Sequence, residues 1–419
     1  MENSVKHDGA YELKTVLLLA VGFGLVGLDR WMVAPLFPYM MRDLGLNFQQ
    51  LGNLIGVLAV AWGAWAIASG PISDRIGRKN ILVWTMIAFS LLSSLSGLAT
   101  GFASLMLIRG IMGIAEGAFT PASVAATSEA SLPSRRGFNL GFQMSMFSLL
   151  GLGVAPILAT QLLRVMPSWH WVFMVSAVPG LIVAVLCVKV LRDRPGAEIL
   201  VANSLNRPKV QWRSIFASRN VAVAIAAMLC AMAGIFVIGA MVPTYLVAVL
   251  HLDAQSMGFV ASALGFGGFI GSFSLSGVSD YIGRKAAAIG AFAVAAVLLF
   301  LFSRTGANPT TLFVLLFGIS MCSIGLLSLL SGPIATEAAP TGLVASTIGL
   351  ISGVGEIFGG GVAPVIAGYI AQNFGLPHIF DFALAGLVLG VFVVFALAET
   401  APRRKEIVSA ATEEKRQIA

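Results

Sequence analysis

Five ionisable residues stand inside long apolar stretches of this 419-residue chain: Asp29, Arg30, Arg109, Glu116 and Glu356. A charged side chain at the centre of a bilayer costs about 2.5 to 3.5 kcal/mol, so such residues generally face a protein interior or a water-filled path. An arginine keeps its proton and offers a planar fork that binds a carboxylate through two hydrogen bonds. Carboxyl groups, by contrast, take up and release protons. The pattern therefore predicts an anion held by Arg30 and protons carried by Asp29 and Glu116.

Spacing limits which of these groups can meet. Asp29 and Arg30 are adjacent, and their side chains diverge by about 100° around a helix axis. Arg109 and Glu116 are seven residues apart, which puts them on one helix face about 10 Å from each other. Each therefore needs another partner, and we assign Arg109 to proton coupling. The structural alternative for Asp29 and Arg30 is a permanent ion pair that only holds helices together.

Glycines accompany two of these charges. In RGIMGIAEG, Gly113 and Gly117 permit close approach of another helix, which leaves a structural role for Arg109 open beside substrate contact. Glu356 lies among glycines in GVGEIFGGGVAP. We expect Glu356 to take part in substrate binding, and the alternative is that its surroundings serve only close packing or a flexible gate.

The elements that must position these groups are transmembrane helices. The chain is 58% hydrophobic and 11% charged, with a mean hydropathy of +0.91, which a soluble domain does not reach. The sequence shows no alternating strand pattern, so a β-barrel is excluded and the fold class is an all-α polytopic membrane protein. Twelve stretches are long enough to cross about 30 Å of hydrocarbon, at 15–41, 50–73, 81–100, 104–129, 138–163, 169–191, 219–250, 256–278, 286–303, 310–336, 343–371 and 377–398.

Basic residues give the orientation. If both termini are cytoplasmic, most of the 26 Lys and Arg residues lie on the cytoplasmic side, as the positive-inside rule requires. The net charge of +7 is then a topology signal, and no basic groove with interleaved aromatics indicates a nucleic-acid partner. We expect a monomeric, multi-pass protein of the inner (plasma) membrane with both termini in the cytoplasm.

The sequence predicts neither a cofactor nor a metal. The three cysteines show no CxxC spacing, and the four histidines lie near loops or span ends. We find no nucleophile and base set that would indicate an enzyme. A Walker A sequence is missing, so an ion gradient must supply the energy. Protons are the favoured coupling ion, because carboxylates are present without an evident set of Na⁺ ligands.

The chain repeats itself. GPISDRIGRK at 70–79 returns as SGVSDYIGRK at 276–285, TSEASLP returns as ATEAAP, and GVAPILA returns as GVAPVIAG. Parallel six-span repeats around a midplane site are the plan of carriers that work by alternating access. The predicted parts are a cytoplasmic tail at 1–14, a six-helix bundle at 15–191, a cytoplasmic linker at 192–218, a second bundle at 219–398 and a cytoplasmic tail at 399–419.

The repeated turn resembles the G-x-x-x-D-R-x-G-R-[RK] signature of the major facilitator superfamily. The matching residues are Gly70, Asp74, Arg75, Gly77, Arg78 and Lys79, and in the second copy Asp280, Gly283, Arg284 and Lys285. In that second copy Tyr281 replaces the first Arg and Ser276 replaces the first Gly. The resemblance implies two pseudo-symmetric bundles of six helices. We expect the turn to act as a charge latch that holds the halves together in one state and releases them in the other.

Further stretches resemble the anion:cation symporter family, which includes sialin-like and galactonate-type carriers. LDRWMVAP carries Asp29 and Arg30, GIAEGAFTPA carries Glu116, WHWVF begins at Trp169, and VPTYL contains Tyr245. The resemblance implies that Asp29 and Glu116 carry protons and that Arg30 meets the substrate carboxylate. We also place Tyr245 in the substrate site.

The second predicted span departs from that family. Members that carry sugar acids tend to have a Tyr and a Gln where this chain has Trp62 and Ala66. Buried substrate hydroxyls left without such partners would cost about 1 to 3 kcal/mol each. Trp31, Trp62 and Trp65 offer flat apolar faces instead, and the aromatic acid:proton symporters are a natural comparison. The alternative for each tryptophan is packing against lipid or other helices.

The resulting prediction is proton-coupled uptake of a small organic monocarboxylate anion, aromatic or relatively apolar, by alternating access across the lipid bilayer. A proton-driven exporter of amphipathic compounds is the main rival. It is disfavoured because GLGVAP at 151–156 has Ala155 where drug:proton antiporters have the second glycine of G-x-x-x-x-G-P. Two further candidates are a sugar-acid:proton symporter and a receptor that keeps the carrier fold without transport.

Overall fold

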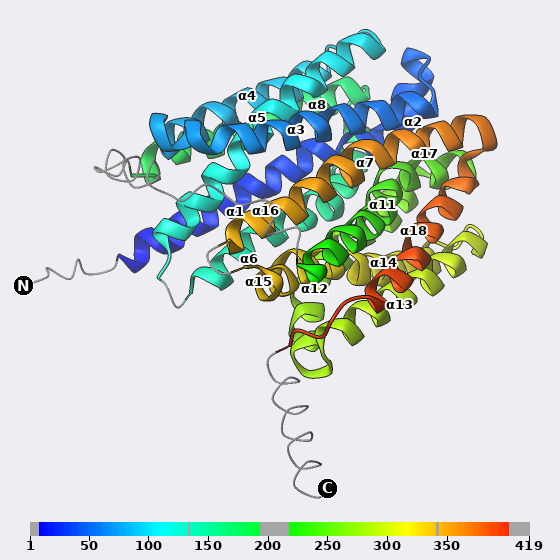
Figure 1. Cartoon of the computed structure of the whole chain (residues 1–419). Helices are drawn as coiled ribbons and strands as arrows, with labels where there is room; N and C mark the ends of the chain where they lie inside the picture. Colours follow the sequence, from blue (N-terminus) through cyan, green and yellow to red (C-terminus); the bar gives the residue numbers. More distant parts are fainter. Residues whose placement is uncertain (1–7, 133–134, 193–217, 341–342, 402–419) are drawn as a thin grey trace, which may run out of the picture. The chain divides into compact units, whose positions relative to one another are not determined.

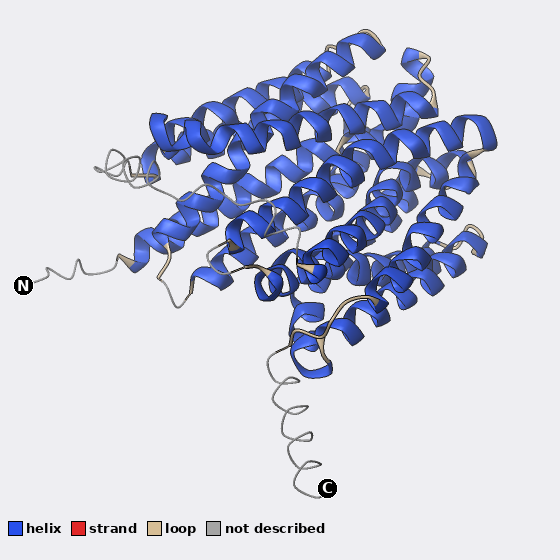
Figure 2. Ribbon diagram, in the orientation of Figure 1, coloured by secondary structure: helices blue, strands red, loops and turns tan. Residues whose placement is uncertain are grey.

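The computed structural model describes residues 8–132, 135–192, 218–340 and 343–401, excluding the side chains of 67–76 and 345–346. Throughout this part of the chain the regular elements are helices, which Figure 2 shows joined by loops without strands. The all-α prediction is confirmed. Eleven helical stretches of the described residues are long and apolar enough to cross a membrane. The remaining predicted span, 50–73, lies in the 29-residue helix α3, Phe48–Ile76.

Two compact units make up the chain, Met1–Pro208 and Lys209–Ala419. The boundary falls in the stretch predicted as a linker, most of which lies outside the described residues. The described helices of the first unit (Figure 1) are α1 (Gly9–Trp31), α2 (Val33–Leu44), α3, α4 (Arg78–Ser96), α5 (Phe102–Ala130), α6 (Arg136–Met146), η1 (Phe147–Val154), α7 (Ala155–Val165) and α8 (Trp169–Val190).

The second unit has the same plan of long helices joined by short turns. Its described helices are α11 (Arg219–Ala248), α12 (Ala254–Ile282), α13 (Arg284–Arg304), α14 (Pro309–Leu329), η2 (Leu330–Ile334), α15 (Ala335–Ala338), α16 (Val344–Gly355), η3 (Glu356–Val362), α17 (Ala363–Phe374), η4 (Leu376–His378) and α18 (Ile379–Phe395).

Short polar side chains start three of these helices. Asp8, Asp253 and Asn308 each accept a hydrogen bond from the backbone amide three residues later. Such caps satisfy amides that have no partner in the first helical turn. Because Asp8 caps α1, the helix begins at Gly9, within the stretch predicted as a tail at 1–14.

Glycines bring α3 and α5 together. A Cβ added at Gly117 would lie 2.5 Å from the carbonyl oxygen of Trp62, and one at Gly113 would clash with the carbonyl of Leu58. The two helices therefore touch backbone to backbone, which is the close approach that RGIMGIAEG predicts. In the second unit α12 and α14 meet in the same way at Gly271.

Two π-helical segments repeat one another. η1 is followed by Ala155 and Pro156, and η3 is followed by Ala363 and Pro364. A proline lacks the amide that would bond to the carbonyl four residues back, and this favours a wider turn in the helix before it. The duplicated GVAP sequence thus marks the same backbone feature in each unit.

Gly113→Ala should destabilise the first unit by about 1 to 3 kcal/mol, because its methyl group would press into the backbone of α3. Gly110→Ala is the matched control on the same helix, since the nearest atom to its Cβ would be in the Val57 side chain at 3.8 Å. Thermal unfolding of the purified proteins in detergent measures the difference. Equal melting temperatures for the two variants would contradict the backbone contact.

Candidate functional site

Asp29 and Arg30 lie at the end of α1, just before the break at Met32 that separates α1 from α2. They are 3% and 4% exposed, respectively. The side chain of Arg30 is therefore enclosed by protein. A buried charge of this kind requires compensating contacts, because its hydration is lost.

Three aromatic rings lie close to the Arg30 guanidinium. Its Cζ is 5.9 Å from the ring centroid of Trp31, 6.0 Å from that of Trp62 and 5.9 Å from that of Phe147. The rings belong to α1, α3 and η1. Aromatic faces within about 6 Å attract a cation electrostatically. We call Trp31, Trp62 and Phe147 the aromatic cluster.

The aromatic cluster contains two of the three predicted tryptophans, whereas Trp65 is 38% exposed. The indole Nε1 of Trp62 is buried and has no hydrogen-bond partner among the residues that the structure describes. A buried donor without a partner costs about 1 to 3 kcal/mol, so an acceptor on a bound ligand would be favourable there. Sequence reasoning missed Phe147, because only the packing of η1 against α1 brings its ring to Arg30.

Asp29 accepts a hydrogen bond from a side chain of α4, which in turn contacts a side chain of α8. Ser93 Oγ donates to Asp29 Oδ1 at 2.8 Å, and the Oγ atoms of Ser93 and Ser176 are 2.9 Å apart. Ser176 Oγ also lies 2.8 Å from the carbonyl oxygen of Phe173. The hydrogen-bond partner of Asp29 is thus a serine that no sequence pattern singles out, since serine is common in membrane helices.

Arg109 supports the backbone that carries the site. It is 1% exposed, and its Nη1 donates to the carbonyl oxygens of Asp29 and Arg30, both at 3.2 Å. Its Cζ also lies 5.9 Å from the ring centroid of Phe173. The charges that act on it electrostatically include Glu116, Asp29 and Arg30. This geometry gives Arg109 a positioning role at the end of α1, and its part in proton coupling stays a prediction.

Glu116 begins a row of polar side chains on α5. It is fully buried, the row continues every three or four residues with Thr120, Ser123 and Thr127, and Ser131 follows directly after the helix end. This spacing keeps the row on one face of the helix. A buried acid in a membrane helix commonly marks a path for ions or protons, whereas hydroxyl side chains also bind neighbouring helices.

α6 supplies partners for this row. Gln143 Nε2 donates to Ser123 Oγ at 2.9 Å, and Asn139 Nδ2 donates at 2.8 Å both to Ser131 Oγ and to Glu12 Oε1. Glu12 is 5% exposed, although it falls in the stretch predicted as a tail at 1–14. It is buried because α1 starts earlier than predicted and the carboxylate meets polar groups of α6.

The second unit carries the other two predicted substrate residues. Glu356 is 8% exposed and is the first residue of η3, where the neighbouring glycines pack against methionines of α11. Tyr245 of α11 is 4% exposed, and its ring meets that of Phe380 edge to face at 4.7 Å. Both side chains are buried, and their roles in substrate binding stay predictions.

The duplicated turn has the same backbone in both units. Gly77 and Gly283 have φ values of +94° and +99°, which only glycine adopts without strain. The glycine of the signature is therefore required by the turn itself. Gly70, Asp74 and Arg75 lie in a part of α3 whose side chains are outside the described residues.

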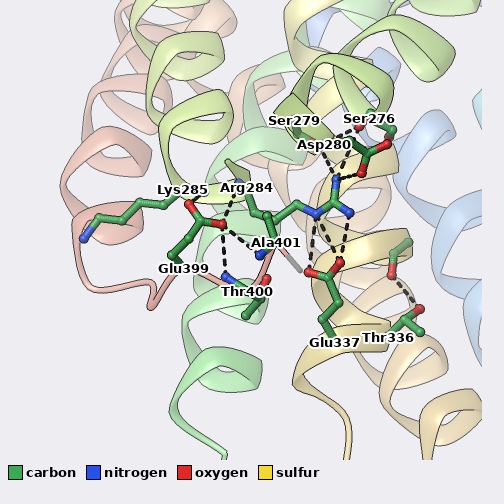
Figure 3. Close-up of polar contacts among 11 residues, drawn as sticks. Ser276, Ser279, Asp280, Arg284, Lys285, Thr336, Glu337, Glu399, Thr400 and Ala401 are labelled. Carbon is green, nitrogen blue, oxygen red and sulfur yellow. Dashed lines mark hydrogen bonds and ion pairs between the residues drawn. The ribbon is translucent and has the colours of Figure 1, made fainter. Parts of the chain in front are cut away.

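The arginine after that glycine forms the same ion pair in each unit. Arg78 pairs with Glu129 at the end of α5, and Arg284 Nη2 lies 2.9 Å from Glu337 Oε1 at the end of α15. Arg284 Nη1 also lies 2.6 Å from Asp280 Oδ1, as Figure 3 shows. The two glutamates belong to the repeated TSEASLP and ATEAAP sequences, so the repeat encodes the ion pair.

Glu399 completes the second copy of the turn (Figure 3). Its carboxylate accepts hydrogen bonds from the backbone amides of Arg284, Lys285, Thr400 and Ala401 at 2.8 to 3.3 Å. Burial alone would raise the pKa of Glu399, but these four amides favour the ionised form and hold the pKa below its usual range. The ionised carboxylate thus caps the start of α13 from beyond the end of α18.

The sequence profile of the Major Facilitator Superfamily matches residues 19–362. The chain belongs to this superfamily. It is therefore a multi-pass membrane transporter and not an enzyme. A bacterial homologue of the human lysosomal transporter Spinster, solved in an inward-facing and occupied conformation, has the same fold, with a TM-score of 0.75 at 17% identity over 92% of this chain and 96% of that chain.

Relatives of this superfamily member transport organic compounds. A probable 4-methylmuconolactone transporter of Cupriavidus pinatubonensis is 28% identical over 94% of this chain and 92% of its own. A probable L-galactonate transporter of Escherichia coli is 25% identical over 91% and 89%, and a sialic acid transporter of Escherichia coli is 27% identical over 85% and 86%. The predicted resemblance to carriers of organic acids is confirmed.

Glu399→Gln should lower the stability of this transporter at pH 7 by about 1 kcal/mol, the usual loss for a helix cap. Because the pKa of Glu399 is lowered in the fold, its contribution is present above the ordinary value of 4.5 and is lost as the pH falls below it. Thermal unfolding at pH 7 and pH 4 should show the difference from the parent protein shrinking in acid. Asp381→Asn, at an exposed position near the start of α18, is the control, and a pH-independent effect of Glu399→Gln would contradict the assignment.

Proposed function

We propose that this transporter takes up a small organic monocarboxylate anion together with protons, and that the anion has an aromatic or otherwise apolar body. The observation that carries the proposal is the buried Arg30 guanidinium beside the aromatic cluster. A guanidinium offers a carboxylate two parallel, charge-assisted hydrogen bonds. The rings offer flat carbon faces to the rest of the anion.

The indole of Trp62 supports the same assignment. Its buried Nε1 would donate to a carboxylate or carbonyl oxygen of the anion. A sugar acid would instead bring several hydroxyls to the carbon faces of the aromatic cluster, at a cost of about 1 to 3 kcal/mol for each hydroxyl left unpaired. The relatives named for galactonate and sialic acid support an acid as substrate, and they make a sugar-acid symporter the second candidate.

In the proposed cycle Asp29 and Glu116 take up protons from the outside, and Arg30 exchanges its internal partners for the anion. On the cytoplasmic side the proton activity is lower, so both acids lose their protons. Arg30 then regains its partners and the anion leaves. With more than one proton per anion, net positive charge enters the cell. A membrane potential of 100 mV then adds about 2.3 kcal/mol per charge to accumulation. In this proposal the protein lies in the plasma membrane, with both termini in the cytoplasm.

Arg30→Ala should weaken the binding of carboxylates by more than about 30-fold, because loss of one partner of a buried charge pair costs about 2 to 5 kcal/mol. Trp62→Phe keeps a ring but removes the Nε1 donor, and should weaken binding about 10-fold. A thermal-shift screen that includes benzoate and galactonate, repeated across pH, measures both effects. Unchanged affinity in Arg30→Ala would remove Arg30 from the site, and a preference for galactonate would favour the sugar-acid candidate.

Glu116→Gln should keep the exchange of anion across the membrane while losing accumulation driven by protons, because glutamine has the shape of the acid but no titrating group. The measurement is uptake of benzoate, or the best ligand of the screen, into proteoliposomes with an acidic exterior. Asp381→Asn, which alters an exposed carboxylate near the start of α18, is the control for a general loss of activity. Unchanged accumulation in Glu116→Gln would reassign the coupling, and loss of the anion on acidifying the outside would support an exporter.

A further inference from the structure

We propose that Ser93 and Ser176 are positioning residues that keep Asp29 hydrogen-bonded in both of its protonation states. They form a chain of two hydroxyl groups, the serine chain, whose hydrogen-bond direction reverses when Asp29 gains or loses a proton. The inference rests on the proposed function of Asp29 as a proton carrier and adds the residues that make both of its states accessible.

The serine chain runs from α1 through α4 to α8. Asp29 Oδ1 is 2.8 Å from Ser93 Oγ, Ser93 Oγ is 2.9 Å from Ser176 Oγ, and Ser176 Oγ is 2.8 Å from the carbonyl oxygen of Phe173. Asp29, Ser93 and Ser176 are 3%, 1% and 5% exposed. Each hydroxyl must therefore find its partners within the protein.

Each hydroxyl has one proton to donate, so the serine chain has two complete arrangements. When Asp29 is ionised, Ser176 donates to Ser93 and Ser93 donates to the carboxylate. When Asp29 is protonated, its own O–H donates to Ser93, Ser93 donates to Ser176, and Ser176 donates to the Phe173 carbonyl. The change requires only rotation of two hydroxyl groups. The added proton stays on Asp29, and no serine O–H bond breaks.

Both arrangements matter because a proton carrier must visit both charge states. A buried donor or acceptor without a hydrogen-bond partner is costly. If the neighbouring groups could bond only to the ionised or only to the protonated carboxyl, Asp29 would stay in that form. Two positive charges lie near Asp29 in the described structure: Arg109 of α5 acts on it electrostatically, and Arg30 is the next residue on α1. The groups of α4 and α8 in the serine chain are the uncharged hydroxyls of Ser93 and Ser176. Substitution of either serine leaves all of these charges in place.

The two serines should have opposite effects on Asp29. Ser176→Ala removes the acceptor that Ser93 needs when Asp29 is protonated, so the titration midpoint of the carboxyl moves to lower pH. Ser93→Ala removes the donor to the ionised carboxylate. Because a hydrogen bond to an ionised group is about twice as strong as a neutral one, the midpoint then moves to higher pH. We expect shifts of about one pH unit, a tenfold change in proton affinity, in each direction.

The measurement is a pH titration of the purified full-length protein that follows the infrared carbonyl stretch of protonated carboxylic acids, with Asp29→Asn identifying the contribution of Asp29. Ser94→Ala is the matched control. Ser94 Oγ donates to the carbonyl of Met174 at 3.2 Å, so it joins the same two helices without contacting Asp29. Ser94→Ala should titrate like the parent protein, and Ser176→Thr, which keeps the hydroxyl, should return the midpoint toward the parent value.

Shifts of the same sign, the absence of a shift, or an equal shift in Ser94→Ala would overturn the proposal. The failure of the serine chain and that of the proposed function are distinguishable. If Asp29→Asn abolishes proton-driven uptake of benzoate while the serine variants titrate like the parent, the serine chain is refuted and the coupling stands. If the serine variants shift in opposite directions while Asp29→Asn still accumulates benzoate, the serine chain stands and coupling through Asp29 is refuted.

Discussion

A permanent positive charge enclosed in an apolar helical bundle is the constraint on which the first unit depends. Arg30 cannot shed its proton and is 4% exposed, so the protein around it must compensate for the lost hydration. Aromatic rings from three elements contribute to this compensation, while the adjacent Asp29 bonds to Ser93 on another helix. The two neighbouring charges thus have separate surroundings. The proposed function requires such a separation, because in it one group holds an anion while the other titrates.

Sequence reasoning located the charges but not most of their partners. Hydropathy predicts the spans because each membrane helix must satisfy its own backbone, and Asp29, Arg30 and Glu116 are conspicuous as rare residue types in apolar stretches. Residue type alone is a weaker guide for tryptophan, since Trp62 joins the aromatic cluster and Trp65 three residues later is exposed. Phe147 depends on tertiary packing, because it reaches Arg30 through the contact of η1 with α1, in which Gly151 faces Gly27 at a distance that leaves no room for a Cβ.

The structure shows that the internal duplication extends from the sequence to the backbone conformation and to an ion pair. Both units have, in the signature turn, a glycine with positive φ and an arginine paired with a glutamate, and elsewhere a π-helical segment before a proline. These features concern the backbone or a salt bridge near a helix end. The charged residues in the middle of the spans are not duplicated in this way, which is consistent with different tasks for the two units.

The bond from Glu399 to the start of α13 also matters to anyone who labels this transporter. Helix α18 ends at Phe395, and a reporter domain or affinity tag joined directly after that residue would delete the carboxylate that α13 needs. A junction placed after Ala401 keeps the carboxylate and both amides that follow it. The helix boundary is therefore the wrong place to cut, and a fusion should begin at least six residues farther along the chain.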